Sequence, residues 1–195
     1  MKEQFYRLMS IYEKKYFQGH ILTKLDFNTL AREGMINFKG PLKIEITEGV
    51  ISGDFLEVGL PPLIVSFKAL EVWKSFESFK TYPVLIEGGV SPVEYTGVVF
   101  LGKGGPFDPA KSKAVYSKAL DEQGKPAIMN YEGMYFDDTH WGGSDLLTIY
   151  EFPCVPIVTE KVVKAMKKAK ITNCTYTPLE KSCIYKKYTV RKAPK

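Results

Sequence analysis

Histidine and cysteine are scarce in this chain of 195 residues, and the few present follow none of the spacings that bind metals. The two histidines are His20 and His140, and the three cysteines are Cys154, Cys174 and Cys183. The cysteines are odd in number and none belongs to a CxxC pair, which argues against a disulfide framework and against a zinc knuckle. We therefore expect small, half-buried thiols in a reducing compartment.

Long apolar runs are also missing. No stretch approaches the roughly 20 apolar residues that cross a bilayer. The first twenty residues, MKEQFYRLMSIYEKKYFQGH, mix apolar with charged residues and lack the apolar region of a signal peptide. A composition of 45% hydrophobic, 13% aromatic and 25% charged residues is that of a folded protein. We expect a cytoplasmic protein that does not enter the membrane, with residues 1–195 as a single domain or with two packed halves, 1–95 and 96–195.

Charge is unevenly distributed along the chain. Residues 151–195 contain 11 Lys and Arg against 3 Asp and Glu, whereas residues 1–150 contain 16 against 19, which gives a total of +5. A basic end can bind phosphate or an acidic partner, or it can be a solvated face. The tyrosines and the arginine near this end suit nucleic acid, but no RNA-binding motif is present, so nucleic acid is not the expected partner. These residues are Tyr176, Tyr185, Tyr188 and Arg191.

Two stretches of the chain share nearly the same pattern. Residues 62–87 are PLIVSFKALEVWKSFESFKTYPVLIE, and residues 155–180 are VPIVTEKVVKAMKKAKITNCTYTPLE. Each begins with a β-branched run that favours a strand. Ser66 or Thr159 then suits a helix N-cap, and apolar residues follow at helical spacing. We expect a strand, a capped helix and a second strand in each stretch, with Trp73 and Met166 at corresponding buried positions.

The two stretches align almost without a gap. Ser66 and Thr159 are 93 positions apart, and the dipeptides Thr81-Tyr82 and Thr175-Tyr176 are 94 apart, so a one-residue insertion would reconcile them. An isolated helix of about 12 residues is marginal, so each unit must pack on a shared sheet. Internal duplication and chance similarity between two strand–helix segments both account for this pattern.

The predicted fold is therefore α+β, with a mixed, largely antiparallel sheet and two N-capped helices on one face. The first helix should end near Phe79, and Asn173 should take a left-handed conformation after the second. Residues 43–59 and 93–102 contain further strand patterns. Residues 1–36 are extended or helical pieces.

One short segment gathers polar groups that can carry function. Residues 136–147, FDDTHWGGSDLL, place Asp137, Asp138, His140, Trp141 and Asp145 around a Gly-Gly pair. Carboxylates with one histidine can bind a divalent metal or transfer protons. The segment can equally be a turn before the strand LLTIYEF, with its tryptophan packed as an anchor. An exposed aromatic residue surrounded by acids suits a protein-binding surface, and we assign these five residues to partner binding.

Other segments give no convincing active site. The sequence GKGG at residues 102–105 lacks the spacing of a phosphate-binding loop, and Pro106 stands where a helix should open, so a plain turn is expected. Nothing in the spacing supplies a general base to a cysteine nucleophile. We assign no catalytic residue, no metal ligand and no cofactor.

The second half of the chain resembles a known family. The shared elements are the aromatic-Gly-Asp step around Trp141, a strand, IVTEK at the start of a helix, and the ending TPLE at residues 177–180. Over roughly residues 95–185 the chain is similar to a bacterial immunity-protein family that is typified by a myxobacterial member and found beside polymorphic-toxin genes. The resemblance implies a non-enzymatic cytoplasmic inhibitor that binds a cognate protein toxin. It carries over no catalytic residue.

The expected function is thus a cytoplasmic binding protein of the immunity type. An enzyme that uses the Asp137–Asp145 loop, with or without a metal, is the first alternative. A nucleic-acid binder that uses the basic C-terminal region is the second. If the toxin is cationic, we expect the acidic side of the chain to face it and the lysines of residues 160–170 to point away.

Overall fold

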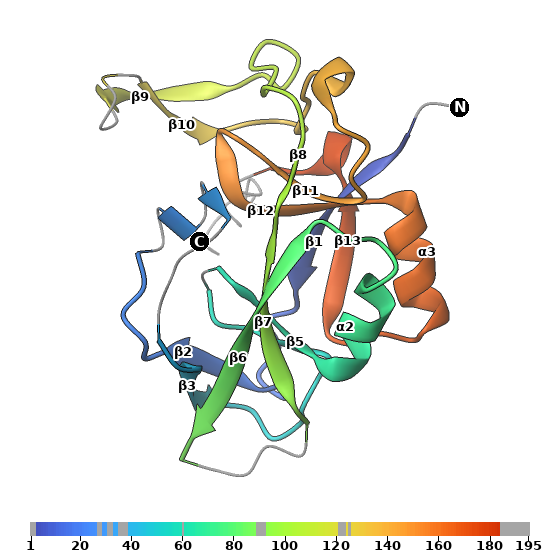
Figure 1. Cartoon of the computed structure of the whole chain (residues 1–195). Helices are drawn as coiled ribbons and strands as arrows, with labels where there is room; N and C mark the ends of the chain where they lie inside the picture. Colours follow the sequence, from blue (N-terminus) through green and yellow to red (C-terminus); the bar gives the residue numbers. More distant parts are fainter. Residues whose placement is uncertain are drawn as a thin grey trace, which may run out of the picture.

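The computed structural model describes residues 3–26, 29–30, 33–34, 39–59, 61–88, 93–120, 124 and 126–183. The protein is α+β, as predicted, and Figure 1 shows its helices α2 (Phe67–Trp73) and α3 (Glu160–Lys168) on one side of a body made mostly of strands. No helix within those ranges is long and apolar enough to cross a membrane.

Within the described residues the strands form three sheets, not the single sheet that the sequence suggested. The five-stranded sheet runs β13 (Cys174–Pro178), β1 (Phe5–Ser10), β12 (Phe152–Thr159), β11 (Leu146–Ile149), β8 (Gly102–Lys103). The six-stranded sheet runs β2 (Gln18–Ile21), β3 (Leu42–Glu48), β6 (Phe79–Glu87), β7 (Tyr95–Phe100), β5 (Leu63–Ser66), β4 (Phe55–Leu56). A separate hairpin of β9 (Val115–Leu120) and β10 (Pro126–Asn130) lies at the top of Figure 1. β3–β6 and β8–β11 are parallel and the other pairs of named strands are antiparallel, which confirms the predicted character.

Four strands of each large sheet share one topology. The first unit has the order β4-β5-β7-β6 and the second the order β11-β12-β1-β13, with antiparallel neighbours throughout. In each unit a helix joins two parallel strands that are separated by a central antiparallel strand. The central strand β7 follows β6 along the chain, whereas β1 comes from the other end of the sequence. The common topology agrees with the repeated sequence pattern, and descent from a duplicated unit stays a prediction.

The strands that follow the two helices, β6 and β13, correspond in a register that differs from the sequence alignment. Residues face one another as Ile64–Gly97–Tyr82 in the first unit and as Ile157–Arg7–Thr177 in the second. Tyr82 therefore corresponds to Thr177, and the alignment of Tyr82 with Tyr176 is wrong by one residue. Because successive residues of a strand face opposite sides, this shift puts the two tyrosines in different cores. Tyr82 packs on the side away from the helices, while Tyr176 packs against the core beneath them.

Helix α2 begins as predicted and ends earlier than predicted. The Ser66 hydroxyl accepts a hydrogen bond from the backbone amide of the third helical residue at 3.2 Å, which satisfies an otherwise free donor. The helix stops at Trp73 and does not reach Phe79. A turn follows in which Glu77 and Ser78 have positive φ angles of 51° and 62°, a conformation that no helix continues.

Helix α3 departs from prediction at both ends. Thr159 occupies the N-cap position, but its hydroxyl makes no capping bond and donates instead to Asp145 Oδ1. Lys170 (φ 53°) is the left-handed residue that follows the helix. Asn173 is also left-handed, as predicted (φ 58°), but it leads into β13. Its side-chain amide donates to the Phe55 carbonyl at 2.7 Å and so joins the two units.

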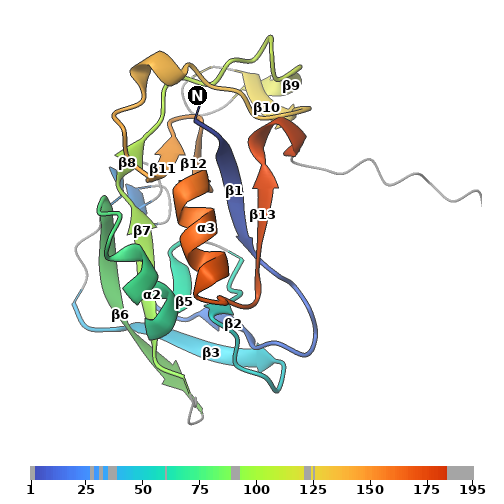
Figure 2. The same ribbon diagram turned by 90° about the vertical axis from the view of Figure 1, so that its right-hand side faces the viewer.

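The two helices pack over a core that both units build. Trp73 and Met166 are fully buried there, which confirms their predicted positions. Apart from Phe100, the other buried members come in corresponding pairs: Val65 and Val158, Ala69 and Val162, Leu70 and Val163, Phe55 and Leu146, Val98 and Leu8. Figure 2 shows α2 and α3 side by side. This shared core makes the two units one folded body.

Candidate functional site

The predicted partner-binding segment forms a compact turn at the upper end of the molecule (Figure 1). It contains the short 3-10 helix η1 (Asp138–His140), which Asp137 caps. Asp137 Oδ1 accepts hydrogen bonds from the Thr139 hydroxyl at 2.6 Å and the Thr139 amide at 3.0 Å, and Oδ2 lies 2.9 Å from His140 Nδ1. The bonds from Thr139, and then His140, hold the pKa of Asp137 below its usual value. The turn thus presents an ionised carboxylate and an exposed imidazole.

This turn is fixed by the GKGG segment beneath it. Gly102 and Lys103 form the edge strand β8 and not the plain turn expected from the sequence. The Asp137 amide donates to the Pro106 carbonyl at 2.9 Å. At Gly105 an added Cβ would lie 1.8 Å from the Asp137 carbonyl oxygen, so only glycine allows this approach. The glycines therefore allow close backbone packing. A phosphate-binding loop would need a helix directly after them, but here strand β8 is followed by a loop.

Trp141 is less available than the sequence suggested. Its indole nitrogen donates to the Ser144 carbonyl at 2.8 Å. Its ring meets the Phe5 ring edge-on, with centroids 5.1 Å apart. The side chain is only partly exposed and packs against the core on the far side of the five-stranded sheet. Trp141 thus anchors the turn to the body of the protein.

Asp145 is also occupied within the fold. Its carboxylate, 18% exposed, accepts the Thr159 hydroxyl and lies 3.7 Å from Lys161 Nζ, while its backbone carbonyl accepts the Thr159 amide at 3.1 Å. Asp145 therefore positions the start of α3. Of the five predicted residues, Asp137, Asp138 and His140 form the outer surface, while Trp141 and Asp145 support it from behind.

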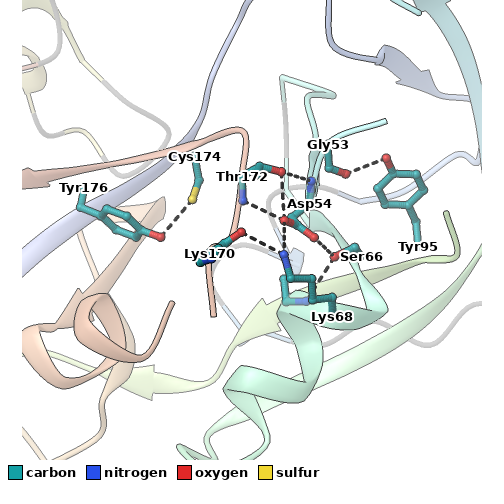
Figure 3. A network of polar contacts seen from close by, with 10 residues as sticks. Gly53, Asp54, Ser66, Lys68, Tyr95, Lys170, Thr172, Cys174 and Tyr176 are labelled. Carbon is teal, nitrogen blue, oxygen red and sulfur yellow. Dashed lines mark hydrogen bonds and ion pairs between the residues drawn. The ribbon is translucent and has the colours of Figure 1, made fainter. Parts of the chain in front are cut away.

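Asp54 plays the same part at the start of α2, and the sequence reasoning missed it. Figure 3 shows its carboxylate accepting bonds from the Ser66 hydroxyl at 2.7 Å and from the Thr172 amide and hydroxyl at 2.8 and 2.9 Å. Lys68 Nζ lies 3.4 Å away and also donates to the Lys170 carbonyl. Burial raises the pKa of Asp54, but the bonds from Ser66 and Thr172, with Lys68, outweigh it and leave the pKa below its usual value. The similar sequences GDFL and SDLL, which contain Asp54 and Asp145, could have indicated that the two aspartates correspond.

A groove of about 460 Å³ opens beside the turn. Its floor is apolar and aromatic, and its lining includes three carboxylate residues and one lysine. The floor residues are Phe5, Met134, Tyr135, Phe136 and Leu179, and the charged residues are Glu3, Asp138, Glu180 and Lys111. Lys111 Nζ lies 5.4 Å from the centre of the Tyr135 ring, a cation–π distance. We call this feature the acidic groove. Sequence reasoning found only Asp138, because Glu3 and Glu180 are distant along the chain.

Helix α3 begins next to the acidic groove. The amide of its first residue, Glu160, donates to the carbonyl of Gln4, which lines the groove. Burial raises the pKa of Tyr6, and the nearby carboxylates of Glu160 and Glu180 raise it further. The carboxylates of Glu160 and Glu180 therefore lie near one another where the N-terminal strand, α3 and η2 (Leu179–Lys181) meet, and Lys164 pairs with Glu160 at 2.9 Å.

Three observations bear on the two alternative functions, an enzyme and a nucleic-acid binder. Among residues with described coordinates, no group of three or more His, Cys, Asp or Glu is placed to hold a metal ion. Burial raises the pKa of Cys174 to about 11 and that of Cys154 above its usual value, although Cys154, against expectation, is exposed. Tyr176 shares a 3.1 Å contact with Cys174 Sγ. The predicted nucleic-acid residues Tyr185, Tyr188 and Arg191 lie outside the described residues.

Comparison of the chain with protein-family models and with curated proteins finds no significant match.

Proposed function

We propose that this chain is a non-enzymatic inhibitor of the immunity type, which neutralises a cognate protein toxin in the cytoplasm by binding it directly. The acidic groove beside the exposed turn of Asp137, Asp138 and His140 carries the proposal. The resemblance of residues 95–185 to immunity proteins supports the same function.

The chemistry of the acidic groove suits a cationic partner. An aromatic floor offers apolar area that contact can bury, and carboxylates around it attract lysine and arginine side chains. Complementary charge of this kind raises the association rate and weakens as salt increases. A secreted nuclease domain, which needs positive charge to hold nucleic acid, has the required character.

Within this proposal the predicted residues divide into two roles. Asp138 lines the groove, and Asp137 and His140 extend the surface beyond it. Trp141 and Asp145 act as positioning residues, because their polar groups are bonded within the fold. Replacing Trp141 should therefore weaken binding by loosening the turn.

Co-expression with a toxin domain encoded by an adjacent gene tests the function. The toxin domain alone should arrest growth, and this chain should restore growth and co-elute with the toxin in a complex of defined stoichiometry. A chain that neither binds nor protects would overturn the proposal. Protection without a complex would also overturn it, because a direct inhibitor must bind.

Charge-reversal variants locate the contact. The double change Asp138→Lys and Glu180→Lys should slow association by about tenfold or more at low salt and flatten its dependence on ionic strength. The double change Glu45→Lys and Glu48→Lys, at two exposed carboxylates on β3 in the other sheet, is the matched control and should have little effect. Equal effects of the control and the groove variant would mean that net charge, and not the groove, governs binding.

A further inference from the structure

A second cavity, of about 210 Å³, lies between the two units. The β4–β5 segment of the first unit forms one wall, and β1 and β12 of the second unit form the other, with β7 and β11 contributing. Leu8, Phe55, Val98 and Phe100 line it and also belong to the core beneath the helices. Leu56, Ile64 and Val99 line it too and belong to the core on the other face of the six-stranded sheet, so the cavity adjoins both cores.

Its walls are rigid and mostly apolar. Pro61, Pro62, Pro153 and Pro156 all line it, and proline fixes its own backbone angle φ. A protein interior normally closes voids by packing side chains together. Walls that cannot relax keep this space open, and the exposed Cys154 on the lining gives it a side that meets solvent.

The polar groups are concentrated at one side. Glu57 Oε2 accepts the Ser10 hydroxyl, and Glu57 Oε1 accepts the Gly59 amide at 2.7 Å. Phe100 of the first unit corresponds to Ser10 of the second, and Thr148 of the second unit corresponds to Glu57 of the first. The corresponding strands therefore line the cavity with the Glu57 carboxylate on one side and the Phe100 ring on the other.

Glu57 sets the sign of charge inside the cavity. The other charged residue on the wall, Arg7, directs its guanidinium to the Cys183 carbonyl at 3.1 Å. Because neighbouring strand residues face opposite sides and Leu8 faces the core, Arg7 faces away from it. Each carboxylate oxygen has two lone pairs, so Glu57 can accept a further hydrogen bond beside those it already receives.

We propose that this cavity binds a small molecule with an apolar body, of the size of a substituted benzene ring, and one amine or hydroxyl donor directed at Glu57. An apolar cavity of about 150 Å³ is known to accept benzene, so the available volume is sufficient. Convergent polar groups in an otherwise apolar pocket fix the orientation of a ligand. A ligand carboxylate would be repelled by Glu57.

Four probes of similar shape test this ligand chemistry on the full chain. Benzylamine, benzyl alcohol, toluene and benzoate are titrated separately while amide chemical shifts and the thermal midpoint are recorded. Benzylamine and benzyl alcohol should raise the midpoint and shift amides of β1, β4 and β7, toluene should do so more weakly, and benzoate should not. Absence of binding by all four at millimolar concentration, or preference for benzoate, overturns the proposal.

Two variants separate a specific site from general apolar binding. Glu57→Gln keeps the shape of the side chain but loses its charge, and should weaken benzylamine about tenfold while leaving toluene unchanged. Leu63→Trp, or Cys154→Trp from the exposed position, should fill the space and abolish binding of every probe. Leu85→Trp, at an exposed site on β6 outside the cavity, is the control. Binding that survives both filling variants, or an equal loss of benzylamine and toluene in Glu57→Gln, contradicts the proposal.

Discussion

The indole nitrogen of Trp73 donates a hydrogen bond to the thioether sulfur of Met166 at 3.2 Å. The two residues are 93 positions apart and occupy the same place in their respective helices. Contact between corresponding residues is what a two-fold arrangement produces. The centre of the molecule is therefore a joint between two like units, and its stability should depend on both sides of that joint.

The first prediction concerns this joint. Trp73→Ala should lower the free energy of unfolding by about 3–5 kcal/mol, because a fully buried aromatic side chain is lost. Trp73→Phe and Met166→Leu should each cost less, and the double variant should cost less than their sum, because both remove the same contact. Urea unfolding monitored by circular dichroism measures these values. Strict additivity would show that the contact contributes no coupling.

The second prediction concerns the start of α3. Thr159→Val keeps the shape of the side chain but removes the donor to Asp145, so it should cost about 1–3 kcal/mol. The loss arises at Asp145 and not at a helix cap, so Thr159→Val should cost much less when Asp145 is already Ala, which has no side-chain acceptor. Equal costs in the two backgrounds would restore the simple capping role that the sequence suggested.

The third prediction is a pH dependence that comes from Asp54. Its pKa is lower in the folded protein than the ordinary 3.8, so its stabilising effect is present above that value. The effect is lost as pH falls through the folded pKa. Asp54→Asn should therefore destabilise the protein at neutral pH and flatten the loss of stability below about pH 4. Denaturant midpoints measured between pH 2 and 7 for the two proteins provide the comparison.

The fourth prediction lies at alkaline pH. Burial, with a smaller effect from Asp54, raises the pKa of Tyr95 to about 12, and its hydroxyl donates to the Gly53 carbonyl at 2.9 Å. A raised folded pKa means that this stabilisation is complete below about pH 10 and declines between pH 10 and 12. Tyr95→Phe should remove one late-titrating phenol from the absorbance at 295 nm. It should also reduce the loss of stability across that interval.

The fifth prediction distinguishes the thiols. Cys154 is exposed, whereas Cys174 is half-buried and contacts the Tyr176 hydroxyl, and burial raises the pKa of Cys174 to about 11. Because the thiolate is the reactive form, a thiol reagent at pH 8 should modify Cys154 well before Cys174. Mass spectrometry of peptides sampled over time gives the order. Reaction of Cys174 first would mean that the end of α3 opens readily.

Features that depend on neighbouring residues were predictable from the sequence. The Ser66 cap and the buried positions of Trp73 and Met166 follow from local spacing, and all are found. The hydrogen bond from Thr159 to Asp145 was not predictable, because the strand order that brings the two residues together cannot be inferred from either local sequence. The alignment of Tyr82 with Tyr176 failed because identical letters weigh more in a sequence comparison than the two-residue alternation of a strand.

The candidate site divides in the same way. Asp137, Asp138 and His140 are close in sequence, and the turn that holds them is local. Glu3 and Glu180 reach the same groove only because β1 and η2 meet there. Composition could indicate that the chain has an acidic part, but only the topology determines which carboxylates share a surface.

The placement of β1 constrains how the protein is made. Residues 5–10 are synthesised long before their partners on the two sides, residues 157–159 and 174–178. At 5–20 residues per second, the first strand waits on the order of ten seconds for those partners to be synthesised. The first unit already has all four of its strands by residue 100 and can fold during that interval. The second unit can close only after residue 178 has been synthesised, so the nascent chain carries the unpaired strand β1 until then and should depend on chaperones that bind such segments.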